Sequence, residues 1–164
     1  MDRTTEHYLT FRLDGELYAL RVSEVSEVLE YTKVTRLPRA DAAMKGIINL
    51  REKSVPVFDL RLRFGLVEVG HSQDTAIIVV ELAGNEGETL KVGAMVDGVE
   101  EVLEIRESDI EPAPTMGARL AADLIAGIAR RDGKFIILID IDSVFSSGDR
   151  DAIARTPTRE VATA

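Results

Sequence analysis

The chain has no cysteine and no tryptophan, and aromatic residues make up only 5% of its 164 residues. The lack of cysteine excludes disulfides and thiolate chemistry, and it fits a reducing cytoplasm. Because aromatics are scarce, valine, isoleucine and leucine must build the core, which favours strands over helices. No apolar run approaches the roughly 18 residues that a membrane helix needs, and no signal peptide is legible in the polar first residues.

Positive charge is also in short supply. Lysine and arginine number 20 against 29 aspartates and glutamates, which gives a net charge of −9. No basic run is present that could neutralise phosphates, and this argues against nucleic acid binding. An anionic membrane surface would repel the chain, so we expect no direct membrane insertion. Protein partners are the class that remains.

Catalytic motifs are missing too. The patterns of serine hydrolases, P-loop and dinucleotide binding and zinc proteases are all absent. The two histidines, His7 and His71, lie among polar residues, and we expect both to be solvated. We therefore expect no enzymatic activity, no metal and no cofactor.

The chain contains an internal repeat. Residues 46–60 return in altered form as residues 127–141, at a constant offset of 81. A second echo, at an offset of 74, relates residues 25–30 to residues 99–104. Two echoes in the same order predict two similar β-rich halves, and a cleft between two small barrels is where function would be sought.

Period-two alternation and turn residues predict mostly strands. Asp14 and Gly15 supply the two positive-φ positions of a type I′ hairpin turn, and residues 51–53 lie at or near the tip of a later hairpin. Short helices are expected at about 39–45 and 118–126. The predicted strands span residues 7–13, 17–22, 27–32, 47–50, 54–59, 75–82, 90–96, 99–105, 128–130 and 135–139.

These elements predict an all-β fold with short helices. We expect a single domain over residues 7–147, with a first barrel at about 17–66 and a second at about 75–147. The N-terminal strand is a candidate for exchange between the barrels, and the short connection near residues 65–74 favours rigid packing. We expect residues 148–164 to form a tail that is frayed or disordered beyond a short helix, and the whole to be a free-standing protein.

Three aspartates invite a different interpretation. Carboxylates at strand ends can hold Mg²⁺ or Ca²⁺, so a divalent-metal hydrolase using Asp59, Asp140 and Asp142 is an alternative of another class. However, Asp59 and Asp140 are equivalent in the repeat, and each precedes a short run with helical spacing. Capping of a helical turn explains both positions at once.

Two other groups are candidates for partner binding. Glu24, Glu27 and Glu30 alternate with apolar residues; such a run is either a solvated face or an apolar stripe edged by carboxylates that suits a basic partner helix. Arg51 is either a solvated hairpin tip, as Arg131 in the second copy indicates, or an interface anchor.

Several of these residues also carry a resemblance. Residues 45–51 and 55–61, with further matches at 18–20, 25–29, 96–99 and 112–114, resemble the CheW family of chemotaxis coupling proteins over about residues 8–145. The resemblance implies two five-stranded SH3-like barrels packed together and no enzymatic activity. It also implies a cytoplasmic adaptor, recruited to membrane receptor arrays, that bridges a CheA histidine kinase and the tips of methyl-accepting chemoreceptors. A CheW-like adaptor of a non-motility pathway is the nearest alternative.

The resemblance also implies sites. The receptor-contact residues would be Val25, Glu27 and Arg51, with Val28, Gly46 and Asn49 as neighbours. The kinase regulatory domain, and ring contacts between adaptor copies, would involve Glu111, Pro112, Pro114 and Met116. The chain departs from the family pattern at three positions. Glu52 stands where glycine is common, Glu111 where a basic residue is common, and Met116 where an aromatic is common.

Overall fold

The computed structural model of the protein describes residues 5–38, 43–113 and 123–155. Strands dominate these residues, as expected from the composition. The elements are β1 (Thr5–Leu13), β2 (Glu16–Arg21), η1 (Val22–Glu24), β3 (Val25–Glu30), β4 (Met44–Leu50), β5 (Lys53–Asp59), α1 (Leu60–Arg63), β6 (Ala76–Ala83), β7 (Thr89–Val96), β8 (Gly98–Arg106), η2 (Glu107–Asp109), β9 (Ile110–Glu111), β10 (Ile125–Arg131), β11 (Lys134–Ile139), α3 (Ile141–Val144) and α4 (Ser147–Ala154).

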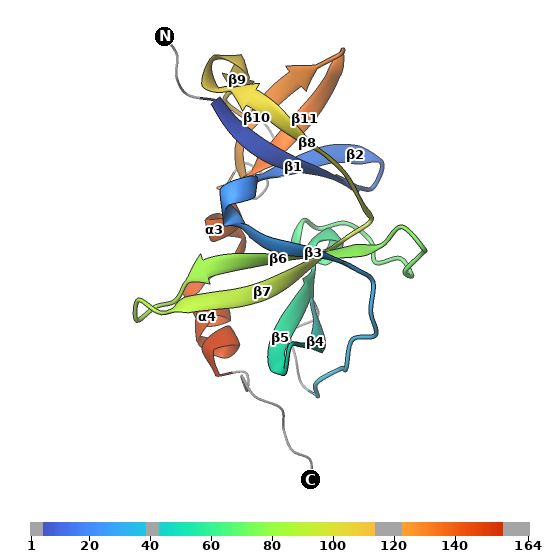
Figure 1. Cartoon of the computed structure of the whole chain (residues 1–164), viewed down its shortest axis with the longest axis vertical. Coiled ribbons are helices and arrows are strands. Elements are labelled where there is room, and N and C mark those ends of the chain that lie inside the picture. The colour runs from blue at the N-terminus through green and yellow to red at the C-terminus, as the bar shows by residue number, and fades with distance from the viewer. Residues whose placement is uncertain (1–4, 39–42, 114–122, 156–164) are drawn as a thin grey trace.

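The strands form two sheets that are stacked end to end along the long axis of the molecule (Figure 1). The first barrel, β3 to β7, has the strand order β3-β6-β7-β5-β4. The second barrel has the order β8-β1-β2-β11-β10-β9, in which the two-residue β9 adds a sixth strand to the expected five. The predicted fold class, two packed β-barrel subdomains with short helices, is confirmed.

The division of strands between the barrels differs from our expectation. The boundaries 17–66 and 75–147 are wrong, because each repeat gives its first hairpin to the other barrel. The hairpin β1-β2 pairs with β8 and β11, while β6-β7 pairs with β3 and β5. We expected only one strand to be exchanged. The tight turn at Asp14 (φ 55°) and Gly15 (φ 81°) holds β1 and β2 together, so both cross as a unit.

The repeat itself is visible in the backbone. A register shift lies between Met44 and Gly46 on β4, and the same shift lies between Ile125 and Gly127 on β10, 81 residues later. The amides that follow are also equivalent. Asp59 donates its N–H to the Ala43 carbonyl at 2.8 Å, and Asp140 donates to the Leu124 carbonyl at 2.9 Å. The offset read from the sequence is therefore a structural offset.

The core consists of a large cluster between the barrels and a smaller one inside each barrel. Phe11, Leu20, Ile78 and Val80 of the central cluster are fully buried. Inside the barrels lie the groups around Val57 and around Leu138. Burial of such aliphatic side chains contributes roughly 1.5–3 kcal/mol each, so the seam between the barrels is a main source of stability.

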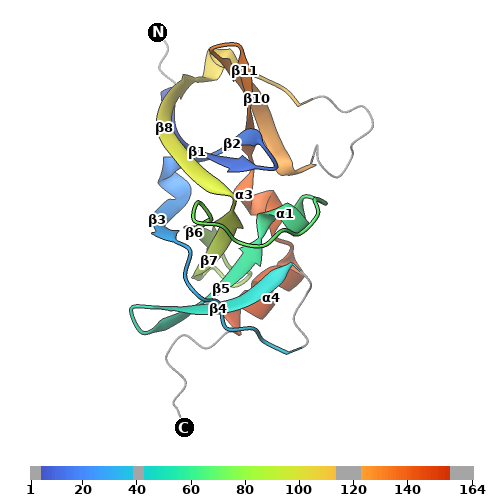
Figure 2. The same cartoon turned by 90° about the vertical axis from the view of Figure 1, so that its right-hand side faces the viewer.

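The buried Arg61 of α1 also joins the two barrels. The Arg61 side chain is only 9% exposed and donates to the Asp97 carboxylate at 2.7 Å, to Asp14 at 3.3 Å and to the Val67 carbonyl at 2.8 Å. Asp14 lies in the β1-β2 turn, so this network ties the first barrel to the hairpin of the second. In Figure 2, α1 lies beside the junction of the two barrels.

The helices differ from the prediction in position. Met44 and Lys45, expected in a helix at 39–45, lie in β4, and residues 39–42 lie outside the described residues. Of the helix expected at 118–126, residues 123–124 are helical, residues 125–126 lie in β10, and residues 118–122 lie outside the described residues. In both places a strand continues through the register shift and the glycine that we interpreted as a helix stop.

The expected tail begins with an ordered helix. Residues 147–154 form α4, the short helix that the sequence allowed at the start of this tail. The Ser146 side chain and Asp149 form a capping box, Ile153 is buried in the central cluster, and Arg63 holds Asp149 by two hydrogen bonds. Tertiary contacts thus stabilise α4, although its sequence has only weak helical periodicity. Within the described residues, no helix is long and apolar enough to cross a membrane.

Candidate partner-binding surface

The β4-β5 hairpin turns on two residues, Arg51 and Glu52, which both have positive φ (54° and 68°). Two-residue turns of this kind normally use asparagine or glycine, because other side chains are strained there. The Asn49 side chain accepts a hydrogen bond from the Glu52 amide at 3.0 Å and so supports the turn. The hairpin presents Arg51 with 71% of its side chain exposed. Figure 2 shows this hairpin projecting from the first barrel.

Arg51 is held by Glu27. Its Nη1 and Nη2 donate to the two Glu27 carboxylate oxygens at 2.7 and 2.9 Å. This two-point hydrogen bond lowers the pKa of Glu27 and raises that of Arg51. β3 and β4 are the two outer strands of the five-stranded sheet, so the pair connects the edges of the first barrel. The structure thus brings together Glu27, Asn49 and Arg51, three of the predicted receptor residues.

The valines of β3 lie on the other face of that strand. Val25 pairs with Val80 and Val28 with Ile78, whereas Glu27 pairs with Val79. Because residues opposite each other in a ladder share a face, Glu27 points away from both valines. Val25 is partly buried against the central cluster, and Val28 is 43% exposed. The six predicted residues therefore do not form one continuous lining.

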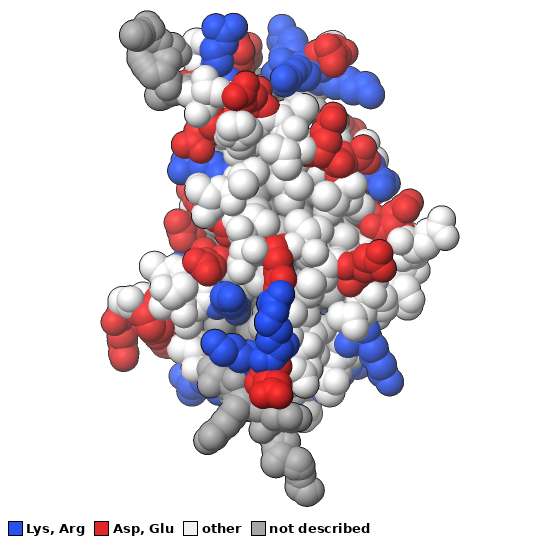
Figure 3. Space-filling view, viewed as in Figure 1, with Lys and Arg blue, Asp and Glu red and all other residues white. Residues whose placement is uncertain are grey.

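The structure adds an apolar face that the sequence reasoning missed. Val22 and Val102 are exposed, Val102 by 52%, and Val99 is partly buried in the central cluster like Val25. β1, β3 and β8 face the viewer in Figure 1, and Figure 3 shows few charged side chains across the middle of that face. Val102 is the repeat equivalent of Val28 at the offset of 74, and this echo was the signal that could have found it.

The backbone conformation and the close neighbours of Gly46 explain why this position is a glycine. Its φ is +145°, and a Cβ at this position would overlap the Thr35 carbonyl oxygen. The next residue, Ile47, exchanges backbone hydrogen bonds of 2.8 Å with Thr35 in both directions. Glycine here lets the segment before β4 lie against the strand. The contact it makes is internal to the barrel.

The interpretation of Arg131 as the counterpart of Arg51 is wrong. The offset of 81 relates Arg51 to Asp132 and Glu52 to Gly133, and the positive φ values of Asp132 (53°) and Gly133 (76°) confirm that equivalence. Arg131 is the last residue of β10. The second hairpin has the ordinary Asp-Gly turn, so the exposed arginine at the turn is specific to the first barrel.

The predicted kinase segment is partly described. Glu111 and Pro112 are exposed at the end of β9. They border a cavity of about 580 Å³ in the second barrel, with Tyr8, Arg21 and Leu138 also in its lining. Pro114 and Met116 lie outside the described residues.

The aspartates of the hydrolase alternative have other partners. Asp59 caps α1 by accepting the Arg61 amide at 2.9 Å, and burial, only partly opposed by this bond, raises its pKa. Asp140 occupies the N-cap position of α3, but its carboxylate accepts the Ser143 hydroxyl instead of a backbone amide. Asp142 pairs with Arg150 at 3.4 Å. In the described ranges, no three His, Asp or Glu side chains converge as a metal site.

Both histidines are exposed, and each lies beside one other side chain. The imidazole of His7 lies 3.5 Å from the Glu104 carboxylate, and both side chains are exposed. The ring of His71 stacks on Tyr31 at 4.0 Å between centroids. The expectation that both are solvated is confirmed by their exposure, and the structure adds one neighbour for each of them.

Comparison with known proteins agrees with this architecture. Residues 7–149 match the CheW-like domain family. The chemotaxis protein CheW of Klebsiella aerogenes is 34% identical over 142 residues, which cover 87% of this chain and 82% of that protein. The corresponding protein of Bacillus subtilis is 32% identical over 143 residues, which cover 87% and 88%.

A solved structure shares the fold. The scaffolding protein TtCheW from Thermoanaerobacter tengcongensis is 38% identical and superposes with a TM-score of 0.78, over 89% of this chain and 96% of that chain. The two barrels described above are the two SH3-like subdomains of this fold. The chain therefore belongs to the CheW family of chemotaxis scaffold proteins, which are adaptors without catalytic activity.

Proposed function

We propose that this adaptor couples methyl-accepting chemoreceptors to a CheA-type histidine kinase by binding both, in the cytoplasm at membrane receptor arrays. The observation that carries the proposal is an exposed Arg51 on a CheW fold that also exposes an apolar face. Arginine anchors interfaces because its planar fork binds carboxylates at two points and is weakly hydrated. An exposed apolar face beside it supplies area for a partner to bury.

On the receptor side, we propose that a helix of the receptor tip packs on the apolar face, with Val28 and Val102 as its contacts and Val25 beneath them. Arg51 and Glu27 would set the orientation through charge pairing at the edge. Asn49 and Gly46 would act indirectly, Asn49 by supporting the turn and Gly46 by shaping β4. An interface of this transient kind buries an area near the lower end of roughly 1,200–2,000 Å².

On the kinase side, we propose that the segment from Glu111 to Met116 contacts the CheW-like regulatory domain. The cavity beside Glu111 and Pro112 is lined by apolar side chains such as Ile105 and Leu138 together with charged ones, which suits insertion of a partner side chain. Contacts at both barrels would join two weak interactions into one assembly through effective concentration. Contacts between adaptor copies would extend the assembly into rings.

The test is a binding measurement with purified parts. The Arg51→Glu variant is expected to lose binding to a chemoreceptor cytoplasmic fragment and to keep binding to the kinase regulatory domain. The matched control is Arg131→Glu, which makes the same charge change beside the equivalent hairpin of the other barrel and is expected to bind the receptor normally. Circular dichroism and thermal melting of both variants exclude unfolding as the cause.

Two results would contradict the proposal. If the wild-type protein binds neither fragment, the coupling function is wrong. If Arg51→Glu binds the receptor as well as the wild type does, Arg51 is not part of the site. Identification of the receptor that co-purifies from cells then decides between a motility pathway and a non-motility chemosensory pathway.

A further inference from the structure

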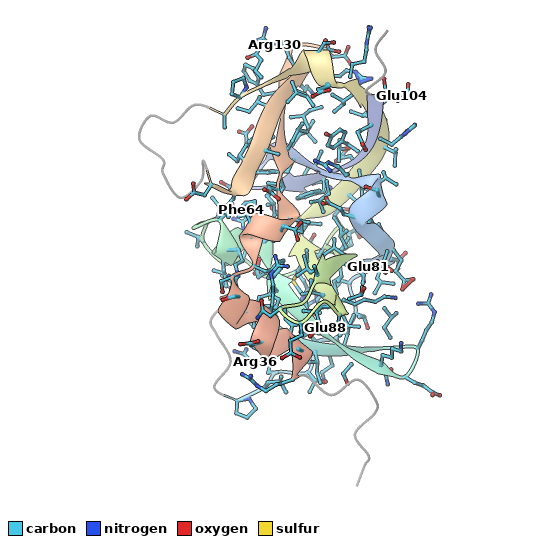
Figure 4. All side chains as sticks on the ribbon, turned by 90° about the vertical axis from the view of Figure 1, so that its left-hand side faces the viewer. Arg36, Phe64, Glu81, Glu88, Glu104 and Arg130 are labelled. Carbon is cyan, nitrogen blue, oxygen red and sulfur yellow. The ribbon has the colours of Figure 1, made fainter. Side chains whose placement is uncertain are left out.

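The free end of the second barrel collects basic side chains. Arg130 and Arg131 end β10, Lys134 begins β11, and Arg106 ends the nearby β8. We refer to these four residues together with Phe135 as the basic tip. Figure 4 shows Arg130 at the opposite end of the molecule from Arg36 and Glu88. In a chain with a net charge of −9, a group of four cations at one end stands out, with Glu104, Asp109 and Asp132 in or beside it.

The basic side chains of the tip have no carboxylate partners. Five other arginines, residues 12, 51, 61, 63 and 150, each pair with an aspartate or glutamate. Among the described residues, none of the four cations at the tip forms an ion pair. Arg131 makes only long hydrogen bonds of 3.4 Å to the Glu104 carbonyl. Their capacity to bind carboxylates is unused.

The cross-strand pairs of the β10-β11 hairpin also distinguish the basic tip from the rest of the molecule. Arg131 is paired directly with Lys134 across the ladder, and like charges in that position destabilise a sheet. Arg130 is paired with Phe135 and its guanidinium lies over that ring at 5.1 Å, although 57% of Phe135 is exposed. Arginine and aromatic residues are enriched in protein interfaces. An unfavourable charge pair and an exposed aromatic in one hairpin indicate a binding role.

The first barrel provides an internal comparison. At the equivalent positions of the β4-β5 hairpin, Asn49 is paired with Ser54 and Leu50 with Lys53. Neither a pair of like charges nor an exposed aromatic occurs there. The basic tip is therefore not a requirement of the hairpin fold, since the same turn geometry forms without it.

A cavity of about 320 Å³ lies at the tip and is lined in part by Arg106, Arg130 and Arg131. Glu104 and Asp109 also line it, and Glu104 lies 3.5 Å from His7. The guanidinium groups are thus arranged around a concave space, beside an exposed aromatic ring. Carboxylates of a partner would fit such a space, and a hydrophobic residue of the partner would cover the ring.

We infer that the basic tip is a docking surface for an acidic segment of a partner protein that also carries a hydrophobic residue. The guanidinium groups would pair with its carboxylates, and Phe135 would receive the apolar side chain. A protein partner is favoured over a nucleic acid because the net charge of −9 opposes a long polyanion. An exposed aromatic ring also suits an apolar side chain of a protein. The inference goes beyond receptor and kinase coupling and does not depend on it.

The experiment is a titration of isotopically labelled protein followed by amide NMR shifts. The probe is a short synthetic peptide of glutamate and leucine, and the control peptide has glutamine in place of glutamate. The glutamate peptide is expected to shift amides at Arg106 and at residues 130–135, with an effect that weakens as salt is added. The glutamine peptide is expected to shift none of them.

The decisive variant is Arg131→Glu. It places a carboxylate opposite Lys134, so we expect its melting temperature to equal or exceed that of the wild type. We expect its affinity for the peptide to fall about three- to tenfold. Loss of binding in a protein that is at least as stable cannot arise from misfolding. Lys53→Glu changes the first-barrel equivalent of Lys134, beside the equivalent turn. It is the matched control and is expected to bind normally.

Other results would overturn the inference. Shifts centred on Arg51, or equal shifts with the glutamine peptide, would show that the tip is not the site. Equal shifts with inorganic phosphate would show simple anion binding. Stronger binding to phosphatidylglycerol vesicles or to single-stranded DNA than to the peptide would assign the tip to a lipid surface or to a nucleic acid.

Discussion

Arg51 and Glu27 join the two outer strands of the first barrel through two hydrogen bonds of 2.7 and 2.9 Å. Arg51 is the more exposed of the two, with 71% of its side chain accessible, whereas only 22% of the Glu27 side chain is accessible. The pair therefore holds the arginine in one orientation at the surface. A partner carboxylate would meet a guanidinium that is already ordered, which reduces the entropy lost on binding.

The turn that carries Arg51 predicts a stabilising substitution. Glu52 has φ +68°, where a residue with a Cβ is less stable than glycine by about 1–2 kcal/mol. We expect Glu52→Gly to raise the stability by about 1 kcal/mol and the melting temperature by ~2–4 °C. Glu52→Ala is the control, since alanine keeps the Cβ and should give no such gain. Equal melting temperatures for the two variants would contradict this account of the turn.

Gly46 predicts a large loss of stability. A Cβ there would overlap the Thr35 backbone, and backbone atoms cannot move aside as the end of a flexible side chain can. We expect Gly46→Ala to lower the free energy of unfolding by at least about 3 kcal/mol, measured by guanidinium titration. Gly87→Ala is the matched control, because Gly87 also has positive φ (+85°) but has no atom nearby. It should lose only about 1 kcal/mol.

Comparing Gly46→Ala with Arg51→Glu distinguishes a residue that supports the fold from a residue that contacts the receptor. Gly46→Ala and Arg51→Glu are both expected to reduce receptor binding, but only Gly46→Ala is expected to unfold at a lower denaturant concentration. If Gly46→Ala melted like the wild type and still failed to bind, the glycine would have to be counted among the contact residues.

Local patterns predicted the local structure well. The Asp14-Gly15 turn, the strand pairs and the Asp59 cap follow from short-range chemistry, namely positive φ, alternation and an N-cap carboxylate. The repeat offset of 81 even fixed the position of equivalent backbone hydrogen bonds. These features depend on residues that are close in sequence, so a single sequence contains the information.

Local sequence patterns could not predict which segments pair when they lie far apart in the sequence. Both possible partners of the β1-β2 hairpin have similar apolar faces, since the two repeats resemble each other, and only the complete packing selects β8 and β11. The same holds for the site. The sequence named Glu27 and Arg51 separately, but their pairing depends on how the first barrel's outer strands approach each other. Docking of α4 likewise depends on Arg63, which lies 86 residues from Asp149.

The buried Arg61 predicts that the junction of the barrels depends on charge. Arg61→Met keeps an apolar stem of similar width but removes the guanidinium, so it leaves Asp97 without its cation. A partly buried charge without a partner is costly. We expect a loss of about 3 kcal/mol in unfolding free energy. Arg12→Met, which breaks a more exposed pair with Glu100, is the control and should lose less than about 1 kcal/mol. Similar losses for both variants would show that burial of Arg61 adds nothing.

Asp149 predicts how the docking of α4 responds to pH. Burial raises the pKa of this carboxyl group, but hydrogen bonds from Arg63 and from Ser146 outweigh burial and hold the pKa below its ordinary value. A carboxyl whose pKa is lower in the folded state stabilises the fold above its unfolded pKa of about 3.9. That stability is lost as the pH falls through the folded pKa.

Asp149→Asn tests this sign directly. At pH 7 the variant should be less stable than the wild type by about 2 kcal/mol, the contribution of hydrogen bonds to a charged group. The difference should shrink as the pH is lowered below about 4, because the wild-type carboxylate becomes protonated and resembles the amide. Guanidinium titrations between pH 7 and pH 3 measure the difference, with the exposed Asp109→Asn as the control. A difference that stayed constant over this range would mean that the charge of Asp149 does not hold α4 in place.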